Sequence, residues 1–273
     1  MVNVKVTNKK SGSVLQDKIF LKEVIAHYKK EGRHDLVWRK KISPYKILVS
    51  EIMLQQTQVL RVVPKFEAWM KKFPTLGKLA TSNLQEVLVL WQGLGYQRRA
   101  KALLSIAKSV TKLPKTYEEL LKLPGIGPYT AGALMAFAYD TFSHPVLETN
   151  IRTVLIEYFH LGETNIHDGV LYDDLARLVN YKNVQQMGAR NFYYALMDMG
   201  AKLKTKKISH NSKSAHHTVQ SKYEGSQRQL RAKTLFAVTH GNPLPKDERL
   251  PAVLLQLTKE GYIKKETTSY VIL

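Results

Sequence analysis

Hydrophobic residues recur at helical spacing along most of the chain. In residues 17–30, for example, one apolar stripe is formed by Ile19, Leu21, Val24, Ile25 and Tyr28. The same spacing predicts helices at 44–59, 63–73, 84–91, 103–110, 118–123, 129–139, 150–159, 170–180 and 191–203. Ser82 and Gln85 stand at capping-box spacing in front of 84–91. The pattern therefore predicts an all-α fold for this part of the chain.

The pattern changes twice towards the C-terminus. Residues 204–226 are polar, basic and poor in aliphatic side chains, as expected of a linker or a surface loop. Residues 227–240 and 247–260 return to helical spacing, whereas 262–273 is typical of two short strands. Two helices followed by a β-hairpin predict a small winged-helix-like unit.

The charge of the chain indicates a polyanionic partner. Its 42 Lys and Arg against 22 Asp and Glu give a net charge of +20, more than solubility requires. Nucleic acid is the first candidate, because neutralisation of phosphates by Lys and Arg supplies most of the non-specific affinity of a protein for nucleic acid. No apolar run is long enough for a membrane span and the N-terminus does not resemble a secretory signal, so we expect a cytoplasmic, nucleoid-associated protein without a membrane partner.

The absence of cysteine narrows the chemistry further. A chain without cysteine has no disulfide, no thiolate zinc site, no cysteine nucleophile and no cysteine-ligated iron–sulfur cluster.

A tight turn, L-P-G-I-G-P, joins two of the predicted helices. Gly125 and Gly127 allow positive φ and leave no side chain in the way, so backbone N–H groups at the start of the next helix can face an anion. In a chain of this charge a phosphodiester is the obvious anion. The alternative is a plain corner between two helices, because Pro-Gly turns are common.

The turn lies within LPGIGPYTAGA, which resembles the helix-hairpin-helix of the HhH-GPD superfamily of DNA glycosylases. The resemblance extends over about residues 20–203 and is strongest to the adenine DNA glycosylase branch in Trp38–Arg39, PYKILVSEIMLQQTQV, VVPKFEAWMKKFPTLGKLA, LWQGLGYQRRAKAL and ALMDMGA. It implies a two-lobed fold with DNA bound between the lobes. We expect an N-terminal arm and helix of the flanking lobe at 1–40, a six-helix barrel with the hairpin at 41–150, the rest of the flanking lobe at 151–225 and the winged-helix-like unit at 226–273.

Glu51 is the first candidate for catalysis. It lies between ILVS and IML on an apolar helix, where burial disfavours the anion and favours the protonated form that a general acid needs. A solvent-facing glutamate on an amphipathic helix is the alternative. By the resemblance, Glu51 occupies the catalytic glutamate position, protonates the adenine and then helps to deliver water.

Glu148 is the second candidate, in HPVLETNIRTV. It immediately precedes a predicted helix, whose dipole favours the anion there, and an anion beside the sugar stabilises a cationic transition state. Helix capping is its alternative role, and the two are compatible. The family motif reads Asp-Gly-Asn, whereas this chain has Glu148, Thr149 and Asn150, so the carboxylate reaches further and a flexible glycine is replaced. The resemblance also places Asn150 in the catalytic set.

Tyr129 stands where bifunctional relatives carry a lysine nucleophile. Because a tyrosine forms no Schiff base, the sequence predicts a monofunctional glycosylase that leaves an abasic site. The amines of Lys122 and Lys204 leave weak strand cleavage as an alternative.

The target base must leave the duplex before it can be attacked. The resemblance assigns DNA and base binding to Trp38, Arg39, Gln55, Gln56, Thr57, Leu94, Tyr96, Gly125, Gly127 and Pro128. Ordinary helix surface for Gln56 and Thr57, and simple packing for Tyr96, are the alternatives. It also implies a monovalent cation on the backbone carbonyls of Leu121, Leu123 and Ile126.

The chain departs from the family in two places. The cluster cysteines of most relatives would fall at Lys204, Asn211, Ser214 and Gln220, so we expect no cofactor beyond that cation. For the histidines of this segment, His210, His216 and His217, we favour contact with the DNA backbone over zinc, since the neighbouring lysines repel a cation. The second departure is the unit at 226–273, which is too short for the C-terminal domain that helps relatives to recognise 8-oxoguanine.

The sequence therefore predicts a monomeric, monofunctional glycosylase that removes adenine opposite 8-oxoguanine or G from double-stranded DNA with a mismatched or damaged base pair. A glycosylase acting on thymine or uracil opposite G, and a DNA-binding module without activity, remain as alternatives.

Overall fold

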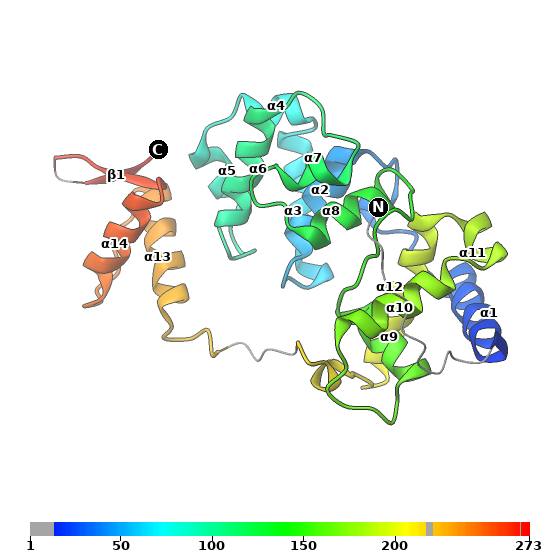
Figure 1. The fold of residues 1–273 in the computed structure, drawn as a ribbon. Coiled ribbons are helices and arrows are strands. Elements are labelled where there is room, and N and C mark those ends of the chain that lie inside the picture. The colour runs from blue at the N-terminus through cyan, green and yellow to red at the C-terminus, as the bar shows by residue number, and fades with distance from the viewer. Residues whose placement is uncertain (1–13, 217–220, 268) are drawn as a thin grey trace. The chain divides into compact units, whose positions relative to one another are not determined.

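The computed structural model describes residues 14–216, 221–267 and 269–273, and most of them are helical (Figure 1). The predicted all-α class is confirmed. The helices are α1 (Val14–Glu31), α2 (Pro44–Leu54), α3 (Val59–Lys72), α4 (Leu76–Ala80), α5 (Leu84–Trp91), α6 (Arg98–Ser109), α7 (Tyr117–Leu121), α8 (Pro128–Phe137), α9 (Thr149–Phe159), α10 (Asp168–Leu178), α11 (Lys182–Met187), α12 (Ala189–Thr205), α13 (Gln227–His240) and α14 (Leu250–Lys259), with short 3₁₀ turns η1 (Val37–Arg39) and η2 (Asn211–Lys213). Most of the expected N-terminal arm, 1–13, lies outside the described residues.

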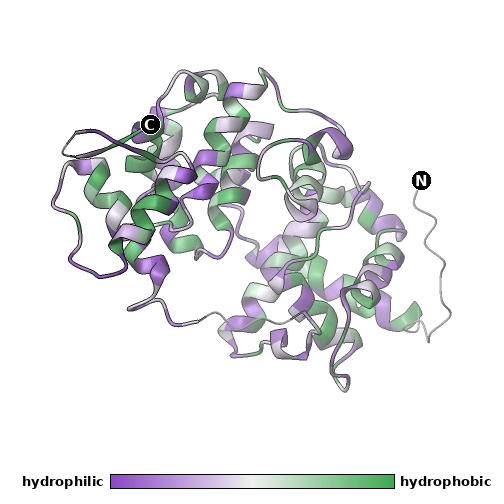
Figure 2. Cartoon of the chain, turned by 60° about the vertical axis from the view of Figure 1, so that its left-hand side comes forward, coloured by the Kyte–Doolittle hydropathy of each residue, from purple (hydrophilic) through white to green (hydrophobic). Residues whose placement is uncertain are grey.

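The chain divides into two compact units. Unit 1 comprises 1–44, 115–117 and 127–218, and unit 2 comprises 45–114, 118–126 and 219–273. Helices of both units carry hydrophobic residues on one side and hydrophilic residues on the other (Figure 2). Each unit therefore has its own core, and we describe the two separately. The four-part division expected from the sequence stays a prediction.

Helix α12 is central to unit 1, where it packs against α1, α8, α9 and α11. The approach to α9 is close at Gly200. A Cβ atom on Gly200 would stand 2.4 Å from the carbonyl oxygen of Asn150 and 2.6 Å from its Cβ atom, so only glycine fits. This close packing fixes the start of α9, the segment that carries the predicted catalytic residues.

A chain of charged groups ties the outer helices of unit 1 together. Arg177 of α10 donates to Asp17 of α1 at 2.9 Å and to Asp174 at 2.7 Å. Asp174 in turn lies 2.7 Å from His160, the residue that ends α9. The hydrogen bond that His160 donates to Asp174 raises the pKa of His160 above its ordinary value, although partial burial works in the other direction.

Large aromatic side chains form the core of unit 2. Trp69 and Trp91 are fully buried and meet edge to face, with ring centroids 5.7 Å apart. The indole N–H of Trp69 donates to the hydroxyl of Tyr45 at 3.0 Å, and that hydroxyl donates to the carbonyl of Phe73 at 2.9 Å. Burial raises the pKa of Tyr45, so this hydroxyl stays a donor at any physiological pH.

Two helix boundaries in unit 2 differ from the sequence-based expectation. Helix α2 ends at Leu54 and not at residue 59, because Gln56 adopts a left-handed φ of 54° and the chain turns before α3. The capping box of α5 is formed by Asn83 and Glu86, one residue later than the predicted Ser82 and Gln85. Ser82 donates its hydroxyl to the carbonyl of Leu79 instead.

The C-terminal part of unit 2 has the predicted order of two helices and a hairpin. Helices α13 and α14 pack on each other, and strands β1 (Ile263–Lys265) and β2 (Tyr270–Ile272) pair antiparallel, with Ile263 opposite Ile272 (Figure 1). Side chains of α5 and α6 hold this part by its backbone. Gln85 donates to the carbonyl of Thr239 at 3.1 Å, and Lys101 donates to the carbonyls of Glu260 and Gly261.

Candidate active site and nucleic-acid interface

Glu51 lies in the most apolar stretch of α2. Its side chain is buried, with 7% of the residue exposed, and every residue from Ile47 to Met53 is buried with it. A carboxyl group in such a position loses water as a partner, which favours its protonated form. The burial agrees with the role of a general acid and argues against the alternative of a solvent-facing glutamate.

Arg99 organises the two loops that the resemblance assigns to DNA recognition. The side chain is buried and stands behind the end of α2, where Nη1 donates to the carbonyls of Ile52 at 2.7 Å and Gln55 at 2.6 Å. Nη2 donates to the carbonyl of Leu94 at 2.8 Å. One cation thus satisfies the orphan carbonyls of a helix end and holds the loop before α6.

The environment of Arg99 is unusual for an arginine. Burial lowers the pKa of Arg99 to about 10, and the neighbouring charge of Arg98 acts in the same direction. The hydrogen-bond acceptors of Arg99 are neutral carbonyls, where arginines usually meet carboxylates. The Trp91 ring lies 5.4 Å from the guanidinium carbon and the Tyr96 ring 5.5 Å. Nothing in the sequence singles Arg99 out from its neighbour Arg98, so sequence reasoning missed it.

Gln56 and Tyr96, two of the residues that the resemblance assigns to DNA and base binding, share a backbone feature. Both have positive φ, 54° and 46°, which residues other than glycine adopt rarely. Such strain persists where surrounding contacts fix the chain, and it is frequent at ligand sites. Here the contacts include Thr57, whose hydroxyl donates to Leu94 at 3.3 Å, and Trp91, which donates to Gly95 at 2.9 Å. The structure thus brings Gln55, Gln56, Thr57, Leu94 and Tyr96 together in unit 2.

Glu148 is the N-cap of α9 in unit 1. One carboxylate oxygen accepts the backbone N–H groups of Asn150 at 2.8 Å and Ile151 at 3.0 Å. The other accepts from the Thr149 hydroxyl and from the Asn150 amide, both at 3.1 Å. The capping role proposed as an alternative is present, and four donors fix the position of the anion. Of the two departures from Asp-Gly-Asn, the threonine hydroxyl contributes one of these four hydrogen bonds.

Trp38 and Arg39 lie on η1 in unit 1. Trp38 is buried, and the side chain of Arg39 is 5% exposed. Arg39 donates to both carboxylate oxygens of Asp198, at 2.7 and 2.9 Å, and its guanidinium carbon lies 3.9 Å from the centre of the Tyr194 ring. Arg33 joins the same carboxylate at 2.6 Å. Burial alone would raise the pKa of Asp198, but the hydrogen bond and charge of Arg39 and the charge of Arg33 hold it below its ordinary value. The assignment of Trp38 and Arg39 to a base pocket stays a prediction.

The hairpin joins α7 to α8. Gly125 has φ of 75°, and a Cβ atom on it would stand 2.8 Å from the Cβ atom of Ala102. Gly127 is the N-cap of α8, and Pro128 occupies the first helical position with Tyr129 next to it. The backbone carbonyls of Leu121, Leu123 and Ile126 are neutral oxygen ligands, the type that suits a monovalent cation. The cation site itself stays a prediction.

Residues 49–187 match the family described as HhH-GPD superfamily base excision DNA repair protein, which is half of the chain. The chain belongs to the HhH-GPD superfamily. An adenine DNA glycosylase of Buchnera aphidicola subsp. Baizongia pistaciae is 36% identical over 189 residues, covering 67% of this chain and 52% of that protein. An adenine DNA glycosylase of Mycolicibacterium smegmatis is 45% identical over 135 residues, covering 47% and 46%. The chain spans about half the length of these curated relatives.

A solved structure supports the HhH-GPD fold. The structure of a thermostable thymine-DNA glycosylase matches with a TM-score of 0.60 and 22% sequence identity, over 74% of this chain and 94% of that one. At this identity the likeness concerns the fold.

The segment after α12, where the resemblance would place cluster cysteines, is held by side-chain and backbone contacts. His210 pairs with Glu157 of α9, and Lys213 donates to the carbonyl of Leu161. Ile166 and Ser214 form a parallel β-bridge, with Ile166 N–H donating to the Lys213 carbonyl at 2.8 Å. Within 14–216, 221–267 and 269–273, no three His, Asp or Glu side chains come together to hold a metal ion, and no helix is long and apolar enough to cross a membrane. Gln220 and His217 lie outside the described residues.

Proposed function

We propose that this HhH-GPD protein is a monofunctional DNA glycosylase that removes adenine opposite 8-oxoguanine or G. The burial of Glu51 carries the proposal, because a buried carboxyl group is suited to protonating a leaving base. Similarity to proteins named adenine DNA glycosylase supports adenine as the base. The net charge of +20 supports double-stranded DNA as the partner.

In the proposed reaction Glu51 gives its proton to a ring nitrogen of the flipped adenine. The N-glycosidic bond then breaks, the base leaves neutral, and the sugar becomes cationic at C1′. The Glu51 carboxylate next takes a proton from water while the water oxygen bonds to C1′. The products are adenine and an abasic site, and Glu51 ends protonated as it began.

Glu148 supplies the negative charge that opposes the sugar cation in this proposal. An anion held by fixed donors needs no reorganisation when the charge develops, which makes its stabilisation effective. Asn150 contributes through its amide, which donates to Glu148 at 3.1 Å and so positions it. Tyr129 provides no amine, so the abasic site is released without strand cleavage.

We further propose that the protein acts as a monomer on nucleoid DNA. Its chemistry needs no redox group, since both steps are proton transfers coupled to breaking and forming a bond at one carbon. A monovalent cation at the carbonyls of Leu121, Leu123 and Ile126 would attract a DNA phosphate to the hairpin.

The test is excision from four duplexes that carry 8-oxoguanine:A, G:A, G:T or G:U, followed by alkaline cleavage of abasic sites. We expect product from the first two. Product from G:T or G:U alone would replace adenine by thymine or uracil as the substrate. Tight binding without product from any duplex would leave a DNA-binding module.

A pair of variants isolates Glu51. Glu51→Gln removes the proton donor with little change in size, and we expect excision to fall by about 10²–10⁴-fold while duplex binding persists. Glu67→Gln is the matched control, because Glu67 is an exposed residue of α3 in the same unit. Activity of Glu51→Gln close to that of Glu67→Gln would remove Glu51 from the mechanism.

A further inference from the structure

A large cavity lies within unit 2, between the loop before α6 and helix α13. Its volume is about 1440 Å³, more than the range of about 300–1,000 Å³ that is typical of small-molecule sites. Gln56 and Tyr96 reach its wall, and the C-terminal part forms the other side. Arg228 of α13 bridges the two sides by donating to the Tyr96 hydroxyl at 3.2 Å. We call this space the C-terminal groove.

The groove is strongly basic. Its lining contains one acidic residue, Glu260, and six basic residues, Arg61, Arg98, Arg228, Arg231, Lys233 and Lys246. Glu260 is paired with Arg231. In the part of the chain that the structure describes, the other five basic side chains form no ion pair with a carboxylate. Such a surface attracts a polyanion, because each cation can neutralise a phosphate.

Aromatic rings and amides complete the lining. Phe236 and Tyr223 are 46% and 53% exposed, a high fraction for rings of their size, and both line the groove. Gln92, Asn242 and Gln256 add amide groups that can pair with base edges. A surface that binds unstacked nucleotides typically combines three kinds of group: cations along the phosphate backbone, flat aromatic rings and amides.

We propose that the C-terminal groove binds a stretch of DNA single strand, with phosphates on its Arg and Lys side chains and bases against Phe236 and Tyr223. Duplex DNA is a poorer fit, because bases stacked in a helix expose only their edges and cannot cover a recessed ring. The proposal rests on the proposed function in that both take DNA as the partner. In this proposal the C-terminal part holds a DNA strand whose bases are unstacked.

The test is binding of a short fluorescein-labelled oligothymidylate to the full-length protein, followed by fluorescence anisotropy over a range of salt. We expect Phe236→Ala to weaken binding roughly tenfold without changing the salt slope, since it removes one stacking surface. Phe236→Tyr should restore most of the affinity. We expect Lys233→Ala to reduce the slope of log K against log salt by about 0.7, the contribution of one single-strand phosphate.

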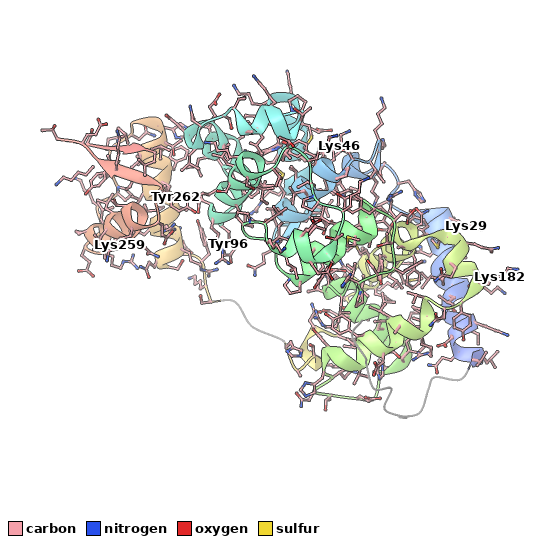
Figure 3. All side chains as sticks on the ribbon, turned by 45° about the horizontal axis from the view of Figure 1, so that its top comes forward. Lys29, Lys46, Tyr96, Lys182, Lys259 and Tyr262 are labelled. Atoms are coloured by element: carbon pink, nitrogen blue, oxygen red, sulfur yellow. The ribbon has the colours of Figure 1, made fainter. Side chains whose placement is uncertain are left out.

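Matched controls lie on α14 of the same unit. Lys259 (Figure 3) is an exposed lysine and Leu255 is an exposed apolar residue, and neither belongs to the lining of the groove. Lys259→Ala and Leu255→Ala are therefore expected to bind the oligonucleotide like wild type. A matched hairpin duplex serves as the second probe, for which Phe236→Ala is expected to have little effect.

Two results would overturn the proposal. One is oligothymidylate binding by Phe236→Ala and Lys233→Ala within about twofold of the α14 controls. The other is a loss on Lys233→Ala that is equal for duplex and single strand, with no effect of Phe236→Ala, which would mean contact with duplex backbone alone. Glu51→Gln separates this test from the excision test, because it should lose excision and keep oligonucleotide binding. Wild-type excision without single-strand binding would reject only the groove.

Discussion

Arg99 Nη2 donates a hydrogen bond of 2.8 Å to the carbonyl of Leu94, while its other terminal nitrogen lies 2.6 Å from the carbonyl of Gln55. A single buried guanidinium therefore connects the loop after α2 to the loop before α6. Both loops contain residues with positive φ, and both lie outside the helices and strands. The geometry of these two loops, which the resemblance assigns to DNA binding, therefore depends on a buried cation behind them.

Arg99→Lys is therefore expected to lower stability and excision together. Lysine has too few donors to reach all the carbonyls, and buried acceptors without a donor cost about 1–3 kcal/mol each. We expect the free energy of unfolding to fall by about 2–4 kcal/mol, measured by urea denaturation. Arg98→Ala is the control for stability, since its side chain is exposed and should change the unfolding free energy by less than about 0.5 kcal/mol. Equal stability of the two variants would contradict the anchoring role.

Glu148 has two roles that can be separated by substitution. Glu148→Gln keeps an oxygen that can accept the N–H groups of Asn150 and Ile151 but loses the negative charge. It should unfold within about 1 kcal/mol of wild type while excision falls by at least about 10²-fold. Glu148→Ala should lose both excision and about 1–2 kcal/mol of stability. Full activity of Glu148→Gln at unchanged stability would leave Glu148 with capping alone.

The contact between Gly200 and Asn150 predicts a sharp effect of one methyl group. In Gly200→Ala the new Cβ atom would overlap the Asn150 carbonyl, so α9 and α12 must move apart. We expect a loss of about 1–3 kcal/mol in unfolding free energy and reduced excision, because the displaced segment also carries Glu148. Gly162→Ala is the control, since nothing lies within 4 Å of the added atom. Equal thermal midpoints for the two variants would show that α9 tolerates the displacement.

The lowered pKa of Asp198 predicts how stability depends on acid. A carboxyl whose pKa is lower in the folded state than its ordinary 3.8 contributes stability that is complete above that value. The contribution is lost as the pH falls through the folded-state pKa, because protonation then releases Arg39 and Arg33. Unfolding free energies of wild type and Asp198→Asn, measured between pH 2 and pH 7 (roughly the range in which carboxyl groups titrate), should converge as the pH falls. A constant difference across this range would contradict the assignment.

Tyr129 predicts the fate of the abasic product. With borohydride present, wild type should form little covalent complex with DNA after excision, because a Schiff base needs an amine. Tyr129→Lys introduces an amine at the position where bifunctional relatives carry one, and should increase trapping. If wild type traps efficiently, Lys204→Ala tests an exposed amine close to Glu148, since Lys204 Nζ lies 3.4 Å from the hydroxyl of the adjacent Thr149.

The sequence was sufficient for those features that depend on local pattern. The stripe in 17–30, the Gly-rich turn at 124–128 and the order of elements after residue 226 all predicted elements that the structure contains. Glu51 could be found as a buried acid because most of its neighbours along the helix are apolar. The Glu148 cap followed from its place just before a helix.

Features that depend on distant partners were not predictable in this way. The end of α2 at Leu54 is set by Arg99, 45 positions further along the chain, so helical spacing alone extended the helix too far. The ion pair between Arg39 and Asp198 was not predicted, because the place of Asp198 in ALMDMGA gives no hint of it, whereas the assignment of Arg39 to base binding stays a prediction. The α5 cap moved by one residue because Ser82 and Asn83 are both good caps, and only the fold decides between them.

Lys101 holds the C-terminal part chiefly at main-chain oxygens, those of Glu260 and Gly261, and its ammonium also lies 4.9 Å from the centre of the Tyr262 ring. Hydrogen bonds to main-chain oxygens do not depend on which side chains the neighbouring positions carry. Exposed positions of α14 and of the hairpin can therefore vary without loss of this attachment, provided that Tyr262 stays aromatic and that position 261, with its φ of 68°, remains glycine. Sequence drift in related chains is expected to collect at these outer positions and to spare the two residues.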